Sequence, residues 1–185
     1  MREKKNNYRC ILHLGFAYIF LVRILYVHKR PQISKLTKKT LMHIKQHPGI
    51  RYRQLLRLSG FANGVLSFHL NKLKKFKIVR AKKVGYSTTR YYPTAIKTAE
   101  SDILDHLLHS TQRKIIFFLL EHSNCRFKEI VQHIERAPST TSFQLQRLEN
   151  TGIISVMRVD KNNQFYRLKN RSRIIKTISK YKITR

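Results

Sequence analysis

Between residues 50 and 79 the apolar positions follow a helical period. Leu66, Leu70 and Leu73 are spaced i, i+4, i+7, which predicts a helix with one apolar stripe. The positions between them are polar, small or cationic: Asn63, Gly64, Ser67, Asn71, Lys72, Lys74 and Lys75. One face of this helix can therefore pack on its own domain while the other face stays available to a partner.

A shorter amphipathic helix is predicted just before it, over residues 52–58. Ser59-Gly60 ends this helix, because glycine tolerates the positive φ that a tight helix C-terminus needs. We expect Asn63 to cap the following helix by accepting a backbone N–H bond. The inward side of the short helix is expected to carry Leu55, Leu56 and Leu58. The pattern indicates a helix-turn-helix, whose second helix is suited to a DNA major groove.

The same pattern occurs again 75 residues further along the chain, without a gap. Ser67-Phe68 aligns with Ser142-Phe143, and further matches are His47 with His122, Arg51 with Arg126, Leu70 with Leu145, Leu73 with Leu148, and Tyr91 with Tyr166. The apolar matches keep the helical period, so the same buried stripe is specified twice. Two copies are too few for a solenoid, and the repeat predicts two small tandem domains over residues 31–99 and 100–185, after residues 1–30.

Other elements complete the first copy. A helix is expected over residues 33–46, with Leu36, Thr40, Leu41 and Ile44 facing inward. Residues 78–92 are rich in β-branched and aromatic residues around a turn near Gly85, which predicts a strand hairpin. A hairpin that follows a helix-turn-helix is a wing.

The second copy repeats this order. Helices are expected over residues 102–109, 112–121, 127–134 and 138–148, with Pro138 or Ser139 opening the last, and a hairpin over residues 153–166. Residues 172–183 predict a short amphipathic helix that lies on the body or forms a homodimer contact. The predicted fold class is mainly α with small β wings (α+β): two tandem winged helix-turn-helix domains after an apolar N-terminal helix.

The chain carries a large excess of positive charge. Its 39 Lys and Arg residues against 9 Asp and Glu residues give a net charge of +30. Residues 31–99 hold 16 Lys and Arg residues and no carboxylate, whereas residues 101–185 hold 16 against 7. A solvated charged surface normally mixes both signs, so this imbalance favours a polyanionic partner, above all for the first domain.

The most apolar run of the chain lies over residues 10–27. It is slightly shorter than the about 20 residues that span a bilayer, and it contains His13 and Arg23. It is apolar on nearly all sides, so we expect it to be buried in lipid or in protein. A membrane anchor over residues 10–28, which would hold a cytoplasmic protein at the membrane, and a helix packed on the body or on a second copy both remain open, as does a misassigned start. A cleaved secretory signal is disfavoured, because no small-residue cleavage site follows.

The remaining candidate chemistry is sparse. Cys10 and Cys125 form no CxxC motif, and a buried thiol at Cys125 is favoured over a redox role. The pairs His43/His47 and His106/His109 have helical spacing but no acidic or thiol neighbour, so no metal site is expected. Phosphate-binding and hydrolase motifs are missing from the sequence. We therefore expect neither a cofactor nor an enzyme.

The residues 63–73, NGVLSFHLNKL, with their support helix and wing, resemble the ArsR/MarR-type winged helix-turn-helix, in the tandem form common among archaeal regulators. The resemblance covers roughly residues 33–170 and implies sequence-directed binding of double-stranded DNA and transcriptional regulation. In the second domain Gln144 replaces the family's histidine and the copy is less basic, so we expect weaker DNA contact there. The resemblance does not imply a metal sensor, because the cysteine ligands of metal-sensing members are missing.

Candidate DNA contacts follow from these patterns. Base edges are expected to meet Asn63, Ser67, His69 and Asn71, with His69 alternatively bonded inside the domain. Gly64 belongs to the same DNA-binding face of the helix. Phosphate contacts are expected from Lys72, Lys74, Lys75, Lys82, Lys83 and Arg90. The second domain offers Ser139, Thr140, Ser142, Arg147 and Lys161. Two alternatives stay open: an architectural or RNA-binding protein that uses charge without base recognition, and an interaction module whose DNA binding is incidental.

Overall fold

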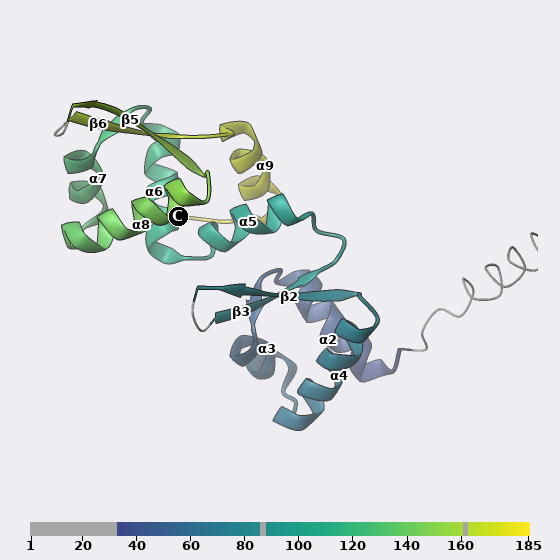
Figure 1. The fold of residues 1–185 in the computed structure, drawn as a ribbon. Coiled ribbons are helices and arrows are strands. Elements are labelled where there is room, and N and C mark those ends of the chain that lie inside the picture. The colour runs from purple at the N-terminus through teal and green to yellow at the C-terminus, as the bar shows by residue number, and fades with distance from the viewer. Residues whose placement is uncertain (1–32, 86–87, 161–162) are drawn as a thin grey trace, which may run out of the picture.

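The computed structural model describes residues 33–85, 88–160 and 163–185, which form helices and two small antiparallel sheets (Figure 1). The first unit comprises α2 (Lys35–Gln46), β1 (Ile50–Arg51), α3 (Tyr52–Ser59), α4 (Asn63–Lys75), β2 (Val79–Val84) and β3 (Thr88–Pro93). The second comprises α5 (Thr98–Leu107), α6 (Ser110–Glu121), β4 (Cys125–Arg126), α7 (Phe127–Ile134), α8 (Pro138–Asn150), β5 (Ile154–Asp160), β6 (Asn163–Leu168) and α9 (Arg171–Tyr181). The predicted α+β class with small wings is confirmed.

The two sheets share one topology. In the first unit β3 lies between β1 and β2, and Ala81 is opposite Tyr91. In the second unit β6 lies between β4 and β5, and Val156 is opposite Tyr166. Since these paired positions differ by the same 75 residues, the repeat in the sequence extends to the register of the strands.

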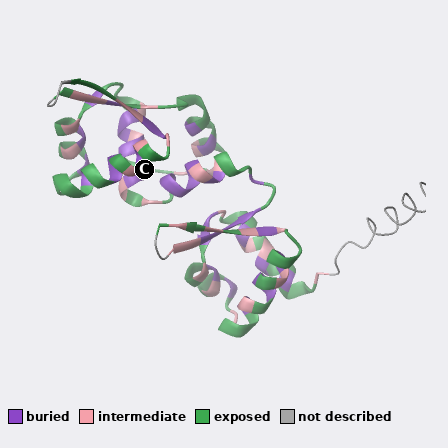
Figure 2. Ribbon diagram, viewed as in Figure 1, coloured by how far each residue is buried: buried purple, intermediate pink, exposed green. Residues whose placement is uncertain are grey.

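Each unit buries the apolar stripe of its second helix. Leu66, Leu70 and Leu73 are at most 2% exposed and pack in one cluster with residues of α2, α3 and β2. Leu145 and Leu148 take the equivalent places in the cluster of the second unit. In Figure 2 buried residues alternate with exposed ones along the helices, so the helical period accounts for the helical part of each core. The strands add residues such as Val79 and Tyr91.

Several local expectations are wrong. Asn63 does not cap α4: the cap is Ala62, and the Asn63 side chain accepts a 2.6 Å hydrogen bond from the Tyr52 hydroxyl instead. Leu58 is 49% exposed, because its position is the outward side of the short α3. Leu36 is 44% exposed, and Thr37 is buried in its place. Pro138 does open α8, as predicted.

The helix α5 runs across the predicted domain boundary at residues 99/100 and contacts both units. Ile103 and Leu107 belong to the core of the second unit, whereas Leu104 packs with Tyr92 and Ile96. The tail forms α9, which lies beside α5, and its Lys180 ammonium is 2.6 Å from Glu100. The amphipathic tail helix thus packs on the body of the chain.

A polar junction joins the wing of the first unit to α5. Asp105 is 5% exposed and accepts hydrogen bonds from the Tyr92 hydroxyl and the Lys82 ammonium, each at 2.5 Å. Arg90 lies beside it, with Nε 3.5 Å from the carboxylate and Nη1 donating to the carbonyl of Gly49 at 2.9 Å. Burial, with the hydrogen bond to Asp105, raises the pKa of Tyr92 far above its ordinary value. The junction therefore holds a buried carboxylate between two cations and a phenol.

The apolar run over residues 10–28 lies outside the described residues. Within residues 33–85, 88–160 and 163–185, no helix combines the length and the apolar character that a membrane crossing requires.

Candidate nucleic-acid interface

The outward face of α4 is the centre of the candidate interface. Asn63, Gly64, Asn71, Lys74 and Lys75 are exposed, and Ser67 and Lys72 are half-buried. The three leucines of the buried stripe fix the rotation of this helix against α2 and α3, so these polar side chains are directed away from the core. The arrangement offers amide and hydroxyl groups near the start of the helix and three ammonium groups near its end, which suits base edges and phosphates respectively.

His69 lies on the other side of α4. It is 7% exposed, and its Nδ1 is 2.8 Å from the Thr37 hydroxyl in the interior of the unit. Its ring also packs edge-on against Phe68, with centroids 5.2 Å apart. The expected base contact is therefore corrected: this histidine joins α4 to α2, which is the alternative that the sequence left open.

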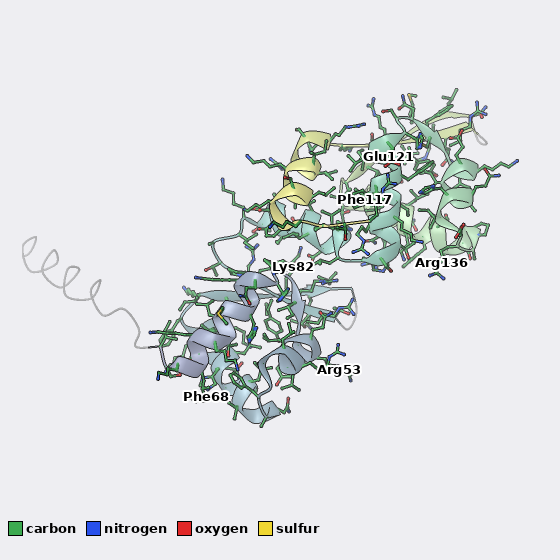
Figure 3. The ribbon with its side chains drawn as sticks, turned by 180° about the vertical axis from the view of Figure 1, so that it is seen from behind. Arg53, Phe68, Lys82, Phe117, Glu121 and Arg136 are labelled. Atoms are coloured by element: carbon green, nitrogen blue, oxygen red, sulfur yellow. The ribbon has the colours of Figure 1, made fainter. Side chains whose placement is uncertain are left out.

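The wing supplies fewer cations than the sequence suggested. Arg90 is 4% exposed and bonded inside the junction, and burial lowers its pKa. Lys82 pairs with both Asp102 and Asp105, and these carboxylates raise its pKa despite the opposing effect of burial. Figure 3 shows Lys82 between the two units. Of the three wing cations predicted for phosphate contact, Lys83 is the exposed one.

The second unit presents a comparable helix. Ser139, Thr140 and Ser142 are exposed on α8. Arg147 is half-buried, with its guanidinium 5.9 Å from the centre of the Phe143 ring. Its side chain also lies near the wing of the first unit, because a Cβ on Gly85 would be 3.7 Å from its terminal nitrogen. Lys161 lies outside the described residues.

Two exposed phenylalanines belong to these surfaces and were not among the predicted contacts. Phe68 is 63% exposed on α4, and Phe143 is 54% exposed on α8. Figure 3 shows Phe68 on the side of the first unit that faces away from the second. The helical period could have found them: Phe68 is rotated by about 200° from Leu66, so it lies opposite the buried stripe. Because the two rings occupy equivalent positions 75 residues apart, they are further candidates for contact with a partner.

Cys125 and His106, two further groups considered from the sequence, are buried and hydrogen-bonded inside the second unit. Cys125 is 3% exposed, its thiol donates to the carbonyl of His122, and burial raises its pKa, as expected for an unreactive thiol. His106 is buried and bonded to Gln112. Within the part of the chain that the structure describes, no three His, Cys, Asp or Glu side chains gather into a metal-binding group.

Comparison with known proteins finds a family match in the second unit. Residues 109–156, from the start of α6 into β5, match the model of the bacterial regulatory protein family arsR. The chain is a winged helix-turn-helix protein. The match falls on the second unit, which is the one that was expected to contact DNA more weakly.

Individual relatives of this winged helix-turn-helix protein are distant. The chain is 26% identical over 153 residues to an uncharacterized HTH-type transcriptional regulator of Methanocaldococcus jannaschii, and the match covers 82% of this chain. It spans only 38% of that relative's length. Among solved structures, the transcriptional repressor BigR from Xylella fastidiosa is 26% identical with a TM-score of 0.40, covering 46% of this chain and 85% of BigR. A conserved hypothetical protein from Chlorobium tepidum is 16% identical with a TM-score of 0.25, covering 82% of this chain and 98% of that chain.

Proposed function

We propose that the chain is a DNA-binding transcriptional regulator, and that α4 of the first unit enters the major groove. The observation that carries this proposal is the division of α4 into a buried leucine stripe and an outward face of amides, hydroxyl and ammonium groups. No carboxylate occurs in residues 33–99, so nothing on this unit's own surface repels a phosphate backbone. The distant relative described as a transcriptional regulator supports the same assignment.

The second unit contributes a supporting contact in this proposal. Its α8 carries hydroxyls at Ser139, Thr140 and Ser142 and the exposed ring of Phe143. Cations are fewer on this helix, where Arg147 is the one basic residue. We therefore assign most of the affinity to the first unit and a share of the sequence preference to the second.

Selection of duplexes from a random pool, followed by competition binding, tests the proposal. A selected duplex should bind at least about a thousandfold more tightly than random duplex at physiological salt. Equal affinity for every duplex would overturn sequence recognition and leave the architectural alternative. Preference for single-stranded or double-stranded RNA would leave the RNA-binding alternative.

Salt dependence locates the contacts. Each phosphate contact contributes about 0.9 to the slope of log affinity against log salt. Lys74→Ala and Lys83→Ala should each reduce this slope by about that amount, for all sequences. Lys176→Ala, which removes an exposed lysine from α9, serves as the charge-matched control and should leave the slope unchanged. Ser67→Ala should instead change the preferred sequence.

Cell fractionation tests the role of residues 10–28. If they anchor the protein, the full chain should pellet with membranes and a chain that begins at Pro31 should remain in the supernatant. If they pack on protein, both chains should remain in the supernatant.

A further inference from the structure

A cavity of about 880 Å³ lies between the two units, next to the junction. On one side it is lined by the end of α2, the turn through Gly49 and the outer part of α3; on the other it is lined by Leu104, Leu108 and residues 180–183. This volume is in the range of about 300–1,000 Å³ that is typical of sites for small organic ligands. Such sites occur preferentially where two domains meet, as here.

The lining combines an apolar floor with a cationic rim. Ile50 and Leu104 are at most 5% exposed, and Leu108 extends the apolar surface. The rim carries Lys45, Arg51, Arg57, Arg90, Lys180 and Lys182, and none of the described lining residues is Asp or Glu. The cavity therefore has a strong excess of positive charge beside an apolar surface.

Most of this charge is not neutralised by neighbouring carboxylates. Lys180 is paired with Glu100, and Arg90 lies beside Asp105. By contrast, no ion pair among the described residues involves Lys45, Arg51 or Arg57. Arg90 is 4% exposed and its guanidinium is already engaged, because Nη1 donates to the carbonyl of Gly49 and Nε lies 3.5 Å from the Asp105 carboxylate. The anchors for an anionic group are therefore the lining cations without an ion pair, Lys45, Arg51 and Arg57.

We propose that this cavity binds a small organic anion: an apolar or aromatic body that carries a carboxylate, sulfonate or phosphate group. The body lies on Ile50, Leu104 and Leu108, and the anionic group is held by the cations of the rim. Because both units line the cavity, the ligand stabilises one arrangement of the first unit relative to α5 and α9. This effect on DNA binding rests on the proposed function, whereas the binding of the anion does not.

Titration with 8-anilinonaphthalene-1-sulfonate, an aromatic sulfonate that fluoresces in apolar sites, tests the proposal on the full chain. One molecule should bind per chain. The uncharged N-phenyl-1-naphthylamine, which has the same ring body without the sulfonate, should bind at least about tenfold more weakly. Equal affinities of the two probes would overturn the assignment of an anion site.

Two arginines on α3 provide a matched pair of variants. Arg57 lines the cavity, whereas Arg53, also exposed and on the same helix, does not. Arg57→Glu should weaken binding of the sulfonate by about tenfold or more, and Arg53→Glu by less than about twofold. The same loss in both variants would mean that the probe responds to net charge alone, which overturns the proposal.

Titration in the presence of a selected DNA duplex tests whether the cavity is distinct from the DNA-binding surface. If the two sites are distinct and coupled, saturating duplex should change the affinity for the sulfonate by a fixed factor, and the sulfonate should change the affinity for DNA by the same factor. If duplex displaces the probe without limit, the cavity belongs to the DNA surface and the proposal is wrong. A chain that binds no DNA but passes the probe tests would overturn the proposed function and leave the anion site standing.

Discussion

Removal of the Asp105 carboxylate should destabilise the protein far more than removal of its neighbour Asp102. Both carboxylates pair with Lys82, but the Asp105 side chain is 5% exposed and the Asp102 side chain is 46% exposed. Breaking a buried ion pair by removing one partner costs about 3–5 kcal/mol, because the other charge is left buried and unpaired. An exposed ion pair contributes only about 0–1 kcal/mol.

The contacts of Asp105 narrow the expected loss in the free energy of unfolding. In Asp105→Ala, Lys82 is 30% exposed and keeps Asp102, so it contributes little to the loss. Arg90 and the Tyr92 hydroxyl, both nearly or fully buried, lose their acceptor. We therefore expect a loss of about 3 kcal/mol, at the lower end of the range for a buried pair. This is a large share of the about 5–15 kcal/mol by which a folded domain is typically stable.

Urea unfolding followed by far-ultraviolet circular dichroism measures the effect. Asp105→Ala should lower the urea midpoint strongly. Asp102→Ala should change the free energy of unfolding by less than about 1 kcal/mol. Since the junction couples two units, the Asp105→Ala transition is also expected to separate into two steps. Equal losses in the two variants, or a loss below about 1 kcal/mol for Asp105→Ala, would refute the role of the buried carboxylate.

Three further predictions concern single residues. Gly49→Ala should lower the free energy of unfolding in urea by about 2–5 kcal/mol, because φ is +82° and the new Cβ would be 2.6 Å from Leu108. Gly60→Ala, at φ +66° with open space around it, should lower it by about 1–2 kcal/mol. Equal losses in the two variants would remove the steric argument. Burial lowers the pKa of His106, so below about pH 6.5 the unfolded chain takes up its proton first, and the free energy of unfolding should fall from pH 7 to 5; a flat profile would contradict this. Phe68→Ala should leave the thermal midpoint unchanged and weaken binding to a selected duplex by about 1 kcal/mol or more, as burying a phenylalanine gains about 1.5–3 kcal/mol; unchanged affinity would place this ring outside the interface.

The sequence was sufficient for the parts of the fold that depend on local periodicity. The spacing of Leu66, Leu70 and Leu73 specified both the helix and its buried face, and the 75-residue repeat extended this to the second unit. The hairpins followed from β-branched and aromatic residues on either side of a turn. These features were predictable because each is fixed by neighbours a few residues away.

The sequence was insufficient where contacts join distant residues. The sequence predicts phosphate contacts at Lys82 and Arg90 because their own unit has no carboxylate, whereas their partners lie on α5 of the other unit. Asparagine is a residue type that often caps a helix, but the Asn63 side chain accepts a hydrogen bond from the Tyr52 hydroxyl of the preceding helix instead. Periodicity locates a face of a helix, but it does not say which distant side chains meet there.

The packing of α9 has a consequence for the order in which the protein is built. Tyr181 and Ile183 lie against the small apolar cluster of Tyr92, Ile96 and Leu104 that spans the two units. A ribosome makes the first unit and its wing well before residues 181–183, so that unit can fold while the later segments are still being synthesised. The apolar cluster that spans the two units is therefore completed last, after translation has passed residues 181–183.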